Sequence, residues 1–238
     1  MILEIAANSV ASALAAQEGG AGRVELCTAL ELGGLTPSYA QIALAREKLS
    51  IPLYVLIRPR AGDFLYSDLE CETMLRDIEA CAKAGCDGVV LGVLDADGNV
   101  DVPRCHSLIS AAGEMGATFH RAFDLARDSL AALEDVIALG SERVLTSGAQ
   151  ITAIEGVVLI RQLIELAAGR IVVMPGAGVN AKNIGELVAR TGASEFHASA
   201  KQLHESRMRR RPPVPSDMQQ GELQSDVEQI RNMVAALR

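Results

Sequence analysis

The chain has 238 residues, of which 49% are hydrophobic and 22% are charged, and this balance excludes an intrinsically disordered protein. Its formal net charge of −8 argues against nonspecific binding to nucleic acid, which needs a basic surface. Trp is absent and there are only four Phe and three Tyr, so the core is expected to be aliphatic.

The sequence shows no segment for export or membrane attachment. It begins Met1-Ile2-Leu3-Glu4-Ile5, without the basic start and apolar stretch of a signal peptide. No apolar run approaches the roughly 20 residues that cross a bilayer. The five Cys are odd in number and form no Cys-x-x-Cys pair, as expected of reduced thiols. These features predict a cytoplasmic protein with no membrane partner.

Eight short apolar runs alternate with longer segments of helical period. They begin between residues 2 and 195, about 28 residues apart on average, and a βαβ unit needs roughly 30 residues. The runs are Ile2–Ile5, Val24–Leu26, Leu53–Ile57, Gly88–Leu94, Ala117–Phe119, Arg143–Thr146, Ile171–Met174 and Glu195–His197. Strands that alternate with helices predict a parallel sheet. Eight even units favour a closed (β/α)8 TIM barrel over an open doubly wound sheet, which leaves two edges.

The pattern changes after the eighth run. Residues 201–222 hold three Pro and little periodicity, which predicts a long loop. Val227, Ile230 and Val234 then predict a C-terminal helix on the barrel exterior. Within the loop, residues 207–211 form a basic cluster, which is either a solvated segment or a docking site for an anion or partner. No composition shift divides the chain, so we expect one TIM-barrel domain over residues 1–238.

The residues after each strand are the functional candidates, because barrel active sites lie at the C-terminal ends of the strands. Glu25 and Cys27 follow the second run and share one face of a strand. Cys27 can be a small buried hydrophobe, whereas a buried Glu25 needs a partner. Glu25 is therefore a candidate catalytic acid or base.

Two arginines follow the third run. Arg58 and Arg60 share a face if the strand extends that far. Two neighbouring guanidiniums repel, so an acidic group is expected between them, either Glu25 or Asp63 or an anionic ligand. Because Arg binds carboxylate and phosphate in bidentate geometry, we assign both arginines to anion recognition.

The fifth run ends in three polar residues, His120, Arg121 and Asp124. His120 is a candidate general acid or base, oriented by Asp124 or Glu25, and Asp124 is a catalytic candidate with it. Arg121 joins the anion-binding candidates. The alternative is a His120 that is satisfied by backbone at a strand end.

The last three strand ends are rich in Gly and Ser. Ser147 follows the sixth run, Gly176 and Gly178 follow the seventh, and Ser199 follows the eighth. Barrels often bind phosphate between the loops after strands seven and eight, where glycines let the backbone approach the anion. These residues form the predicted anion seat, and glycines that serve only tight turns are the alternative.

Taken together, these segments resemble the CutC family, long labelled copper homeostasis proteins. The resemblance extends from Glu4 to about Ala200. It rests on residues 23–27, 33–38, 57–60, 62–64, 118–124, 143–148 and 195–197. It implies a cytoplasmic TIM barrel that forms a homo-oligomer, a dimer or tetramer, with a nominal role in copper handling.

The resemblance also bears on copper. Cu(I) prefers soft thiolate ligands, and family members often carry one Cys at the end of strand one and another at the end of strand two. Here these positions are Ala6 and Cys27, and Leu65 stands where some relatives have a further Cys. Cys27 is therefore the candidate metal ligand.

Three functions stay open from the sequence. The first is Cu(I) binding through Cys27. The second is an enzyme of lyase, aldolase or isomerase type that acts on a small phosphorylated or carboxylated metabolite. The third is a noncatalytic scaffold that uses the basic cluster of residues 207–211.

Overall fold

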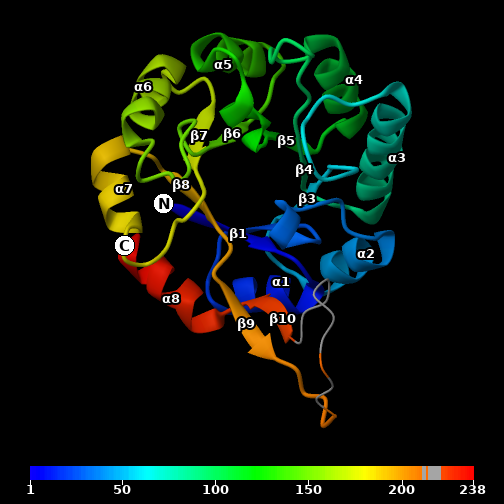
Figure 1. Ribbon diagram of the computed structural model, residues 1–238, viewed down its shortest axis with the longest axis vertical. Helices are drawn as coiled ribbons and strands as arrows, with labels where there is room; N and C mark the ends of the chain where they lie inside the picture. Colours follow the sequence, from blue (N-terminus) through cyan, green and yellow to red (C-terminus); the bar gives the residue numbers. More distant parts are fainter. Residues whose placement is uncertain (211–212, 214–220) are drawn as a thin grey trace.

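The computed structural model describes residues 1–210, 213 and 221–238, where eight parallel strands form a ring surrounded by helices (Figure 1). The strand order is β7-β6-β5-β4-β3-β2-β1-β8, so β8 pairs with β1 and also lies next to β7. The predicted TIM barrel is confirmed. The strands are β1 Ile2–Ala7, β2 Arg23–Leu26, β3 Leu53–Leu56, β4 Gly88–Leu91, β5 Gly116–Phe119, β6 Arg143–Thr146, β7 Val172–Pro175 and β8 Glu195–Ala198.

Helices cover the outside of the ring. They are α1 Val10–Glu18, α2 Tyr39–Lys48, α3 Asp68–Ala84, α4 Val102–Ala112, α5 Ser129–Ala138, α6 Val157–Ala167, α7 Ile184–Thr191 and α8 Val227–Ala236, with short 3-10 helices η1 Leu30–Leu32 and η2 Arg121–Leu125. The predicted C-terminal helix, α8, packs between α1 and α7 (Figure 1). None of the described helices is both long and apolar enough to cross a bilayer.

Local sequence signals fix where these helices begin. Ser38 starts α2 and Ser67 starts α3, each through a capping box with the Gln41 or Glu70 side chain. These reciprocal bonds satisfy backbone N–H groups that the first helical turn leaves free. The capping boxes therefore define the N-terminal ends of α2 and α3.

The core has two parts of different character. The large aliphatic part lies between the barrel and its helices, and outward-facing strand residues such as Leu26, Val55 and Val89 belong to it. Inside the barrel the apolar cluster is small and contains Tyr54 and Leu56. The rest of the interior carries buried charged side chains, so the expectation of an aliphatic core holds only outside the ring.

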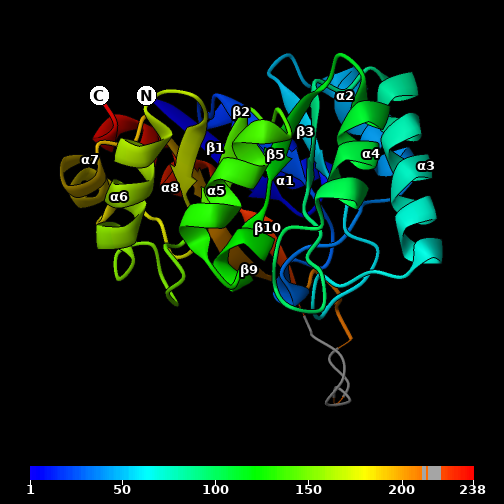
Figure 2. The ribbon, with the colours of Figure 1, turned by 90° about the horizontal axis from the view of Figure 1, so that it is seen from above.

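The segment after β8 corrects the predicted long loop. Two antiparallel strands, β9 Lys201–Glu205 and β10 Gly221–Ser225, lie within it and form a hairpin against α1 (Figure 2). The three Pro that suggested a loop all fall between these strands in the sequence. Ser225 N donates to Ser12 Oγ at 3.0 Å, which ties the hairpin to α1. Residues 207–210 of the basic cluster are exposed, and residue 211 lies outside the described residues.

Candidate functional site

Buried charges fill the interior of the barrel where β1, β2 and β8 meet. The strand register places Glu4 opposite both Arg23 and His197. The Arg23 guanidinium donates to Glu4 and, at 2.6 Å, to Glu195 Oε2. His197 Nδ1 lies 2.7 Å from Glu4 Oε1. These pairings offset the cost of burying charge.

The Tyr54 ring crosses the interior near the N-terminal ends of the strands. Its hydroxyl donates to Glu142 Oε2 at 2.7 Å, and the Arg143 guanidinium lies 5.0 Å from the ring centroid. A Cβ at Gly88 would lie 2.1 Å from Tyr54 Cε1, and one at Gly116 would lie 2.3 Å from the hydroxyl oxygen. Glycine at these two positions therefore makes room for the ring.

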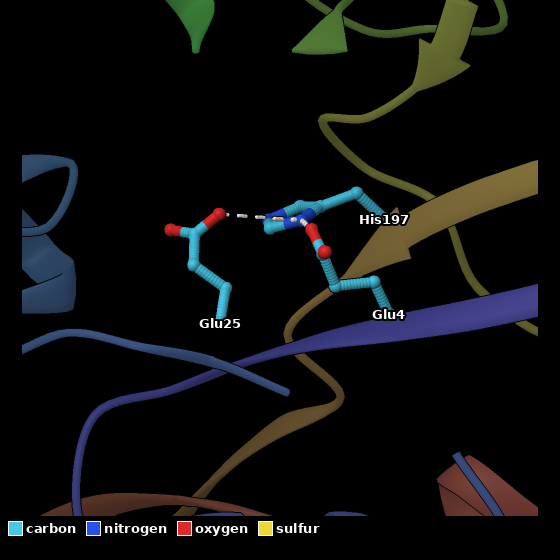
Figure 3. A group of neighbouring side chains, drawn as sticks. All are labelled: Glu4, Glu25 and His197. Carbon is cyan, nitrogen blue, oxygen red and sulfur yellow. Dashed lines mark hydrogen bonds and ion pairs between the residues drawn. The ribbon is translucent and has the colours of Figure 1, made fainter. Parts of the chain in front are cut away.

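Glu25 lies beside this network and makes only a long contact with it (Figure 3). Its Oε2 is 3.7 Å from His197 Nδ1 and has no hydrogen-bond partner among the residues described. Burial raises the pKa of Glu25 to about 7, and the Glu4 carboxylate adds to the rise. Burial opposes charge on Glu4 too, but hydrogen bonds and charges from His197 and Arg23 hold its pKa at about 2. The neighbouring carboxylates in turn raise the pKa of His197 despite its burial.

A cavity of about 90 Å³ lies at the C-terminal ends of the strands. Five predicted candidates line it together: Glu25, Cys27, Arg58, His120 and Arg121. His197 and Ala6 also line it, so the cavity reaches the charged interior. Asp124, Arg60, Ser147, Gly176, Gly178 and Ser199 are not among its lining residues.

Arg58 is a buried cation in the cavity wall, with a relative exposure of 6%. Its Nη1 donates to the carbonyls of Leu32 and Gly34 at 2.9 and 3.0 Å, and its Nη2 donates to the carbonyl of Gly62 at 2.8 Å. Its Nε has no partner, and no carboxylate within the described ranges pairs with it. The Phe64 ring lies 4.9 Å from the guanidinium carbon. The charge of Arg58 is therefore stabilised by carbonyl oxygens and an aromatic ring, without a paired carboxylate.

Arg60 points away from Arg58. Strand β3 ends at Leu56, so the shared strand face on which the prediction depended does not form. Arg60 Nη2 donates to Asp63 Oδ1 at 2.9 Å and its Nε donates to Glu70. Asp63 of this loop and Glu70 of α3 thus pair with Arg60 rather than with Arg58.

His120 is held by backbone, which was the alternative reading of this residue. Its Nδ1 accepts the N–H of Ala122 at 3.2 Å, which places the ring proton of the neutral form on Nε2. Nε2 is buried without a partner. Burial and the nearby Arg58 charge lower the pKa of His120 to about 3, so the ring is neutral at pH 7. The expectation that Asp124 or Glu25 orients the ring is wrong.

Asp124 instead clamps the loop after β6. Its carboxylate accepts bonds from Thr146 Oγ1 at 2.5 Å and from the backbone N–H groups of Ser147 and Ala149. Arg121 Nε donates to it at 2.8 Å and Arg121 Nη2 donates to Ser147 Oγ at 3.0 Å. Asp124 and Ser147 therefore position Arg121 at the cavity mouth.

The glycines and Ser199 of the predicted anion-binding site have packing, turn and hydrogen-bonding roles. A Cβ at Gly176 would lie 2.5 Å from Leu145 Cδ1 and 3.3 Å from His197 Cβ, so this glycine leaves room for these two side chains. Gly178 has a φ of 73° and serves a turn. The Ser199 carbonyl accepts from Ser225 Oγ at 3.0 Å, which anchors the hairpin. The tight-turn alternative fits Gly178.

The sequence and the fold match those of known proteins. The sequence profile of the CutC family matches residues 1–202. The chain belongs to the CutC family. It is 57% identical over 235 residues to the family protein CutC of Xylella fastidiosa strain Temecula1, covering 99% of this chain and 88% of that one. It is 54% identical over 238 residues to the family protein CutC of Xanthomonas campestris pv. campestris strain B100, covering 100% and 99%.

Solved structures agree. CutC from Streptococcus agalactiae, a protein named for copper homeostasis, superposes with a TM-score of 0.80 at 34% identity, covering 83% of this chain and 97% of that one. Thiamine phosphate pyrophosphorylase from Pyrococcus furiosus gives a TM-score of 0.61 at 14% identity, covering 99% and 95%. The second likeness shows the barrel fold alone.

The donor set of this CutC chain fits a thiolate copper site poorly. Cys27 is buried, and burial raises the pKa of its thiol, which favours the protonated form. The other four cysteines lie on α3, on α4 and just before β4, outside the cavity lining. Ala6 faces the cavity where a second thiol would be needed. One thiol alone does not supply the soft ligand pair that Cu(I) prefers.

Sequence reasoning missed Glu4, Arg23 and His197 as part of this CutC site. Each is a charged or titratable residue inside a strand, and Glu4 is the one acid in the first apolar run. Because a buried charge needs a partner, the position of Glu4 inside an apolar run was the available signal. Its partner on β8 is 193 residues away, so the pairing itself required the fold.

Proposed function

We propose that this CutC-family barrel binds a small carboxylated or phosphorylated molecule in the cavity at the C-terminal ends of its strands and performs acid/base chemistry on it. Arg58 is the observation that carries the proposal. Its guanidinium is buried in the cavity wall and donates to backbone carbonyl oxygens, and no carboxylate in the described structure pairs with it. Buried charges are ordinarily paired with opposite charge, and an anion in the cavity would supply that charge.

The cavity limits the size of the ligand. At about 90 Å³ it is smaller than the roughly 150 Å³ that holds a benzene molecule. The enclosed part of the ligand therefore has only a few heavy atoms, and a longer ligand would extend past Arg121 at the mouth.

Two groups in the cavity have different roles, one in proton transfer and one in hydrogen-bond donation. A pKa of about 7 lets Glu25 both take and give a proton at neutral pH, as a general acid or base should. His120 stays neutral and offers its unpartnered Nε2–H to a ligand oxygen. In this assignment Arg58 binds the anion, His120 polarises an oxygen of the ligand, and Glu25 moves the proton.

A binding experiment with a matched pair of variants tests the anion site. Inorganic phosphate, malonate and pyruvate are titrated in thermal-shift and calorimetric assays against wild type, Arg58→Met and Arg60→Met. We expect saturable binding of at least one probe to wild type and to Arg60→Met, and its loss in Arg58→Met. Equal binding by Arg58→Met and wild type would contradict the proposal.

Copper handling is the second candidate, because Cys27 lines the cavity together with His120 and His197, and because the Streptococcus agalactiae relative is named for copper homeostasis. The test is an anaerobic Cu(I) titration against a chromophoric chelator on wild type, Cys27→Ser and, as control, Cys71→Ser. Binding of one Cu(I) per chain that Cys27→Ser abolishes and Cys71→Ser does not would support copper handling. Equal Cu(I) binding by wild type and Cys27→Ser would contradict it. The cytoplasmic location and the homo-oligomer stay predictions.

A further inference from the structure

Three neighbouring strands bring together a mixed carboxylate and imidazole cluster, of which Glu25 and His197 line the cavity and Glu4 is fully buried beside them. Glu4 comes from β1, Glu25 from β2 and His197 from β8, and their ligand atoms all lie within 4.8 Å of one another (Figure 3). We propose that these three side chains bind a divalent transition-metal cation of the Mn²⁺ or Zn²⁺ type. This site uses neither Cys27 nor Arg58, so it goes beyond the proposed anion site. It takes Glu25 as a ligand, and a bound cation would therefore replace the proton-transfer role proposed for Glu25.

The unpartnered oxygen of Glu25 is the second observation behind this proposal. Glu25 is 5% exposed, and its Oε2 has no hydrogen-bond partner in the described part of the chain. At 3.7 Å from His197 Nδ1, that oxygen is beyond hydrogen-bond reach yet points at the cluster (Figure 3). A cation between the three side chains would satisfy it.

The spacing suits a cation with little movement. Oxygen and nitrogen ligands bind Zn²⁺ at about 2.0–2.2 Å, so two ligands of one ion lie about 3 to 4 Å apart. His197 Nδ1 lies 3.7 Å from Glu25 Oε2, within this range, and 2.7 Å from Glu4 Oε1, just below it. To bind a cation, His197 Nδ1 would exchange its hydrogen bond with Glu4 for the metal and release any proton that it carries, and the two carboxylates would rotate toward the ion.

The chemical character of the cluster also favours a cation. Glu4 and Glu25 are buried carboxyl groups in a connected network that also includes Glu142, Glu195, Arg23, Arg143 and the His197 imidazole. A cation beside Glu4 and Glu25 would lie in the barrel interior, where solvent screens its attraction to the two carboxylates little.

The chemistry of the donors selects the class of metal. Two carboxylates and one imidazole suit Mn²⁺, Fe²⁺ or Zn²⁺, whereas Cu(I) prefers sulfur. Glu25 and His197 line the cavity, so the remaining coordination positions of the cation would face it. Such an open position lets a bound cation polarise water or a ligand oxygen.

Direct metal binding tests the proposal on the full-length, metal-stripped protein. Mn²⁺ is titrated by electron paramagnetic resonance, and Zn²⁺ by competition with a chromophoric chelator. Wild type should bind one cation per chain. Glu25→Gln keeps the side-chain shape and breaks no hydrogen bond of Oε2, so it should fold normally and weaken binding at least about 100-fold. His197→Asn should weaken it similarly, and His120→Asn, the other cavity imidazole, should not.

Two outcomes overturn the proposal: fewer than one cation per wild-type chain at millimolar metal, or equal affinity in wild type and a Glu25→Gln variant with unchanged thermal unfolding. Arg58→Met separates this site from the anion site, since it should bind Mn²⁺ like wild type while it loses phosphate or malonate. Failure of metal binding with intact anion binding would remove the metal site alone.

Discussion

Asp124 in η2 holds the backbone of Ser147, the residue that follows β6. The two Asp124 carboxylate oxygens share the Ser147 N–H at 2.9 and 3.0 Å. The Ser147 hydroxyl lies 3.0 Å from Asp124 Oδ2 and 2.6 Å from the Gln150 carbonyl, and its one proton goes to one of these acceptors. Asn at position 124 would remove the charge and turn an amide N–H toward these donors. We expect Asp124→Asn to lower the free energy of unfolding by about 2–3 kcal/mol, measured by urea denaturation.

Asp97→Asn is the matched control for this change. Asp97 is exposed, and surface substitutions of this kind usually stay within about 0.5 kcal/mol. A loss in Asp124→Asn no larger than that of Asp97→Asn would mean that the clamp contributes nothing to stability.

Two glycines should respond to alanine in opposite directions. At Gly88 a Cβ would lie 2.1 Å from Tyr54 Cε1, so Gly88→Ala should destabilise the fold by at least about 1–3 kcal/mol through overpacking. At Gly185, inside α7, a Cβ meets nothing within 4 Å and φ is not positive. Gly185→Ala should therefore stabilise by about 0.5–1 kcal/mol, because alanine favours helix. Urea denaturation of both variants checks the signs; destabilisation of the same size in both would refute the role of Gly88.

His120 should make the protein acid-sensitive. The ordinary pKa of His is 6.5, and burial beside Arg58 lowers that of His120 to about 3 in the native state. Between these values the unfolded chain binds a proton that the native chain does not, so stability falls as pH decreases from about 6.5 toward 3. The contribution amounts to about 1.4 kcal/mol per pH unit.

The comparison of variants isolates this effect from the other acids. The free energy of unfolding of wild type, His120→Asn and His106→Asn is measured at pH 6.5 and 5. The decrease on acidification should be smaller in His120→Asn by about 1.4 kcal/mol per unit, while His106→Asn, an exposed position, should follow wild type. Parallel curves for all three would show that His120 is not buried as a neutral group.

The barrel was readable from the sequence because its evidence is local. Each apolar run such as Leu53–Ile57 and each intervening helical stripe signals its own element, and eight repeats determine the architecture. The hairpin β9–β10 was not readable, since prolines dominate the segment and the pairing of Leu203 with Leu223 spans it.

The site could be predicted only in part, because many of its contacts are between residues far apart in the sequence. The position after a strand identified Glu25, Arg58 and His120 as facing one cavity. Their partners could not be inferred, because they depend on where β3 ends and on which strands are neighbours. Arg60 thus pairs with Glu70 in the first turn of α3, and the partner of Glu4 is supplied by β8 at the other end of the chain.

The Glu4 carboxylate should contribute far more to stability than an exposed carboxylate in an ion pair. Glu4 is fully buried and pairs with both Arg23 and His197. Glu4→Gln leaves Arg23 with Glu195 alone and His197 with the more distant Glu25, and removing one partner of a buried pair costs about 3–5 kcal/mol. Glu186 pairs with Arg190 at 2.8 Å on the surface of α7, where such a pair contributes about 0.5 kcal/mol or less.

Urea denaturation at pH 7 of Glu4→Gln and Glu186→Gln compares the two directly. A loss several-fold larger in Glu4→Gln would show that the charged interior holds the first and eighth strands together, which is where the barrel closes. If both variants lose similar amounts, the interior must be wet enough to screen Glu4. The His197 imidazole would then not depend on its hydrogen bond to Glu4.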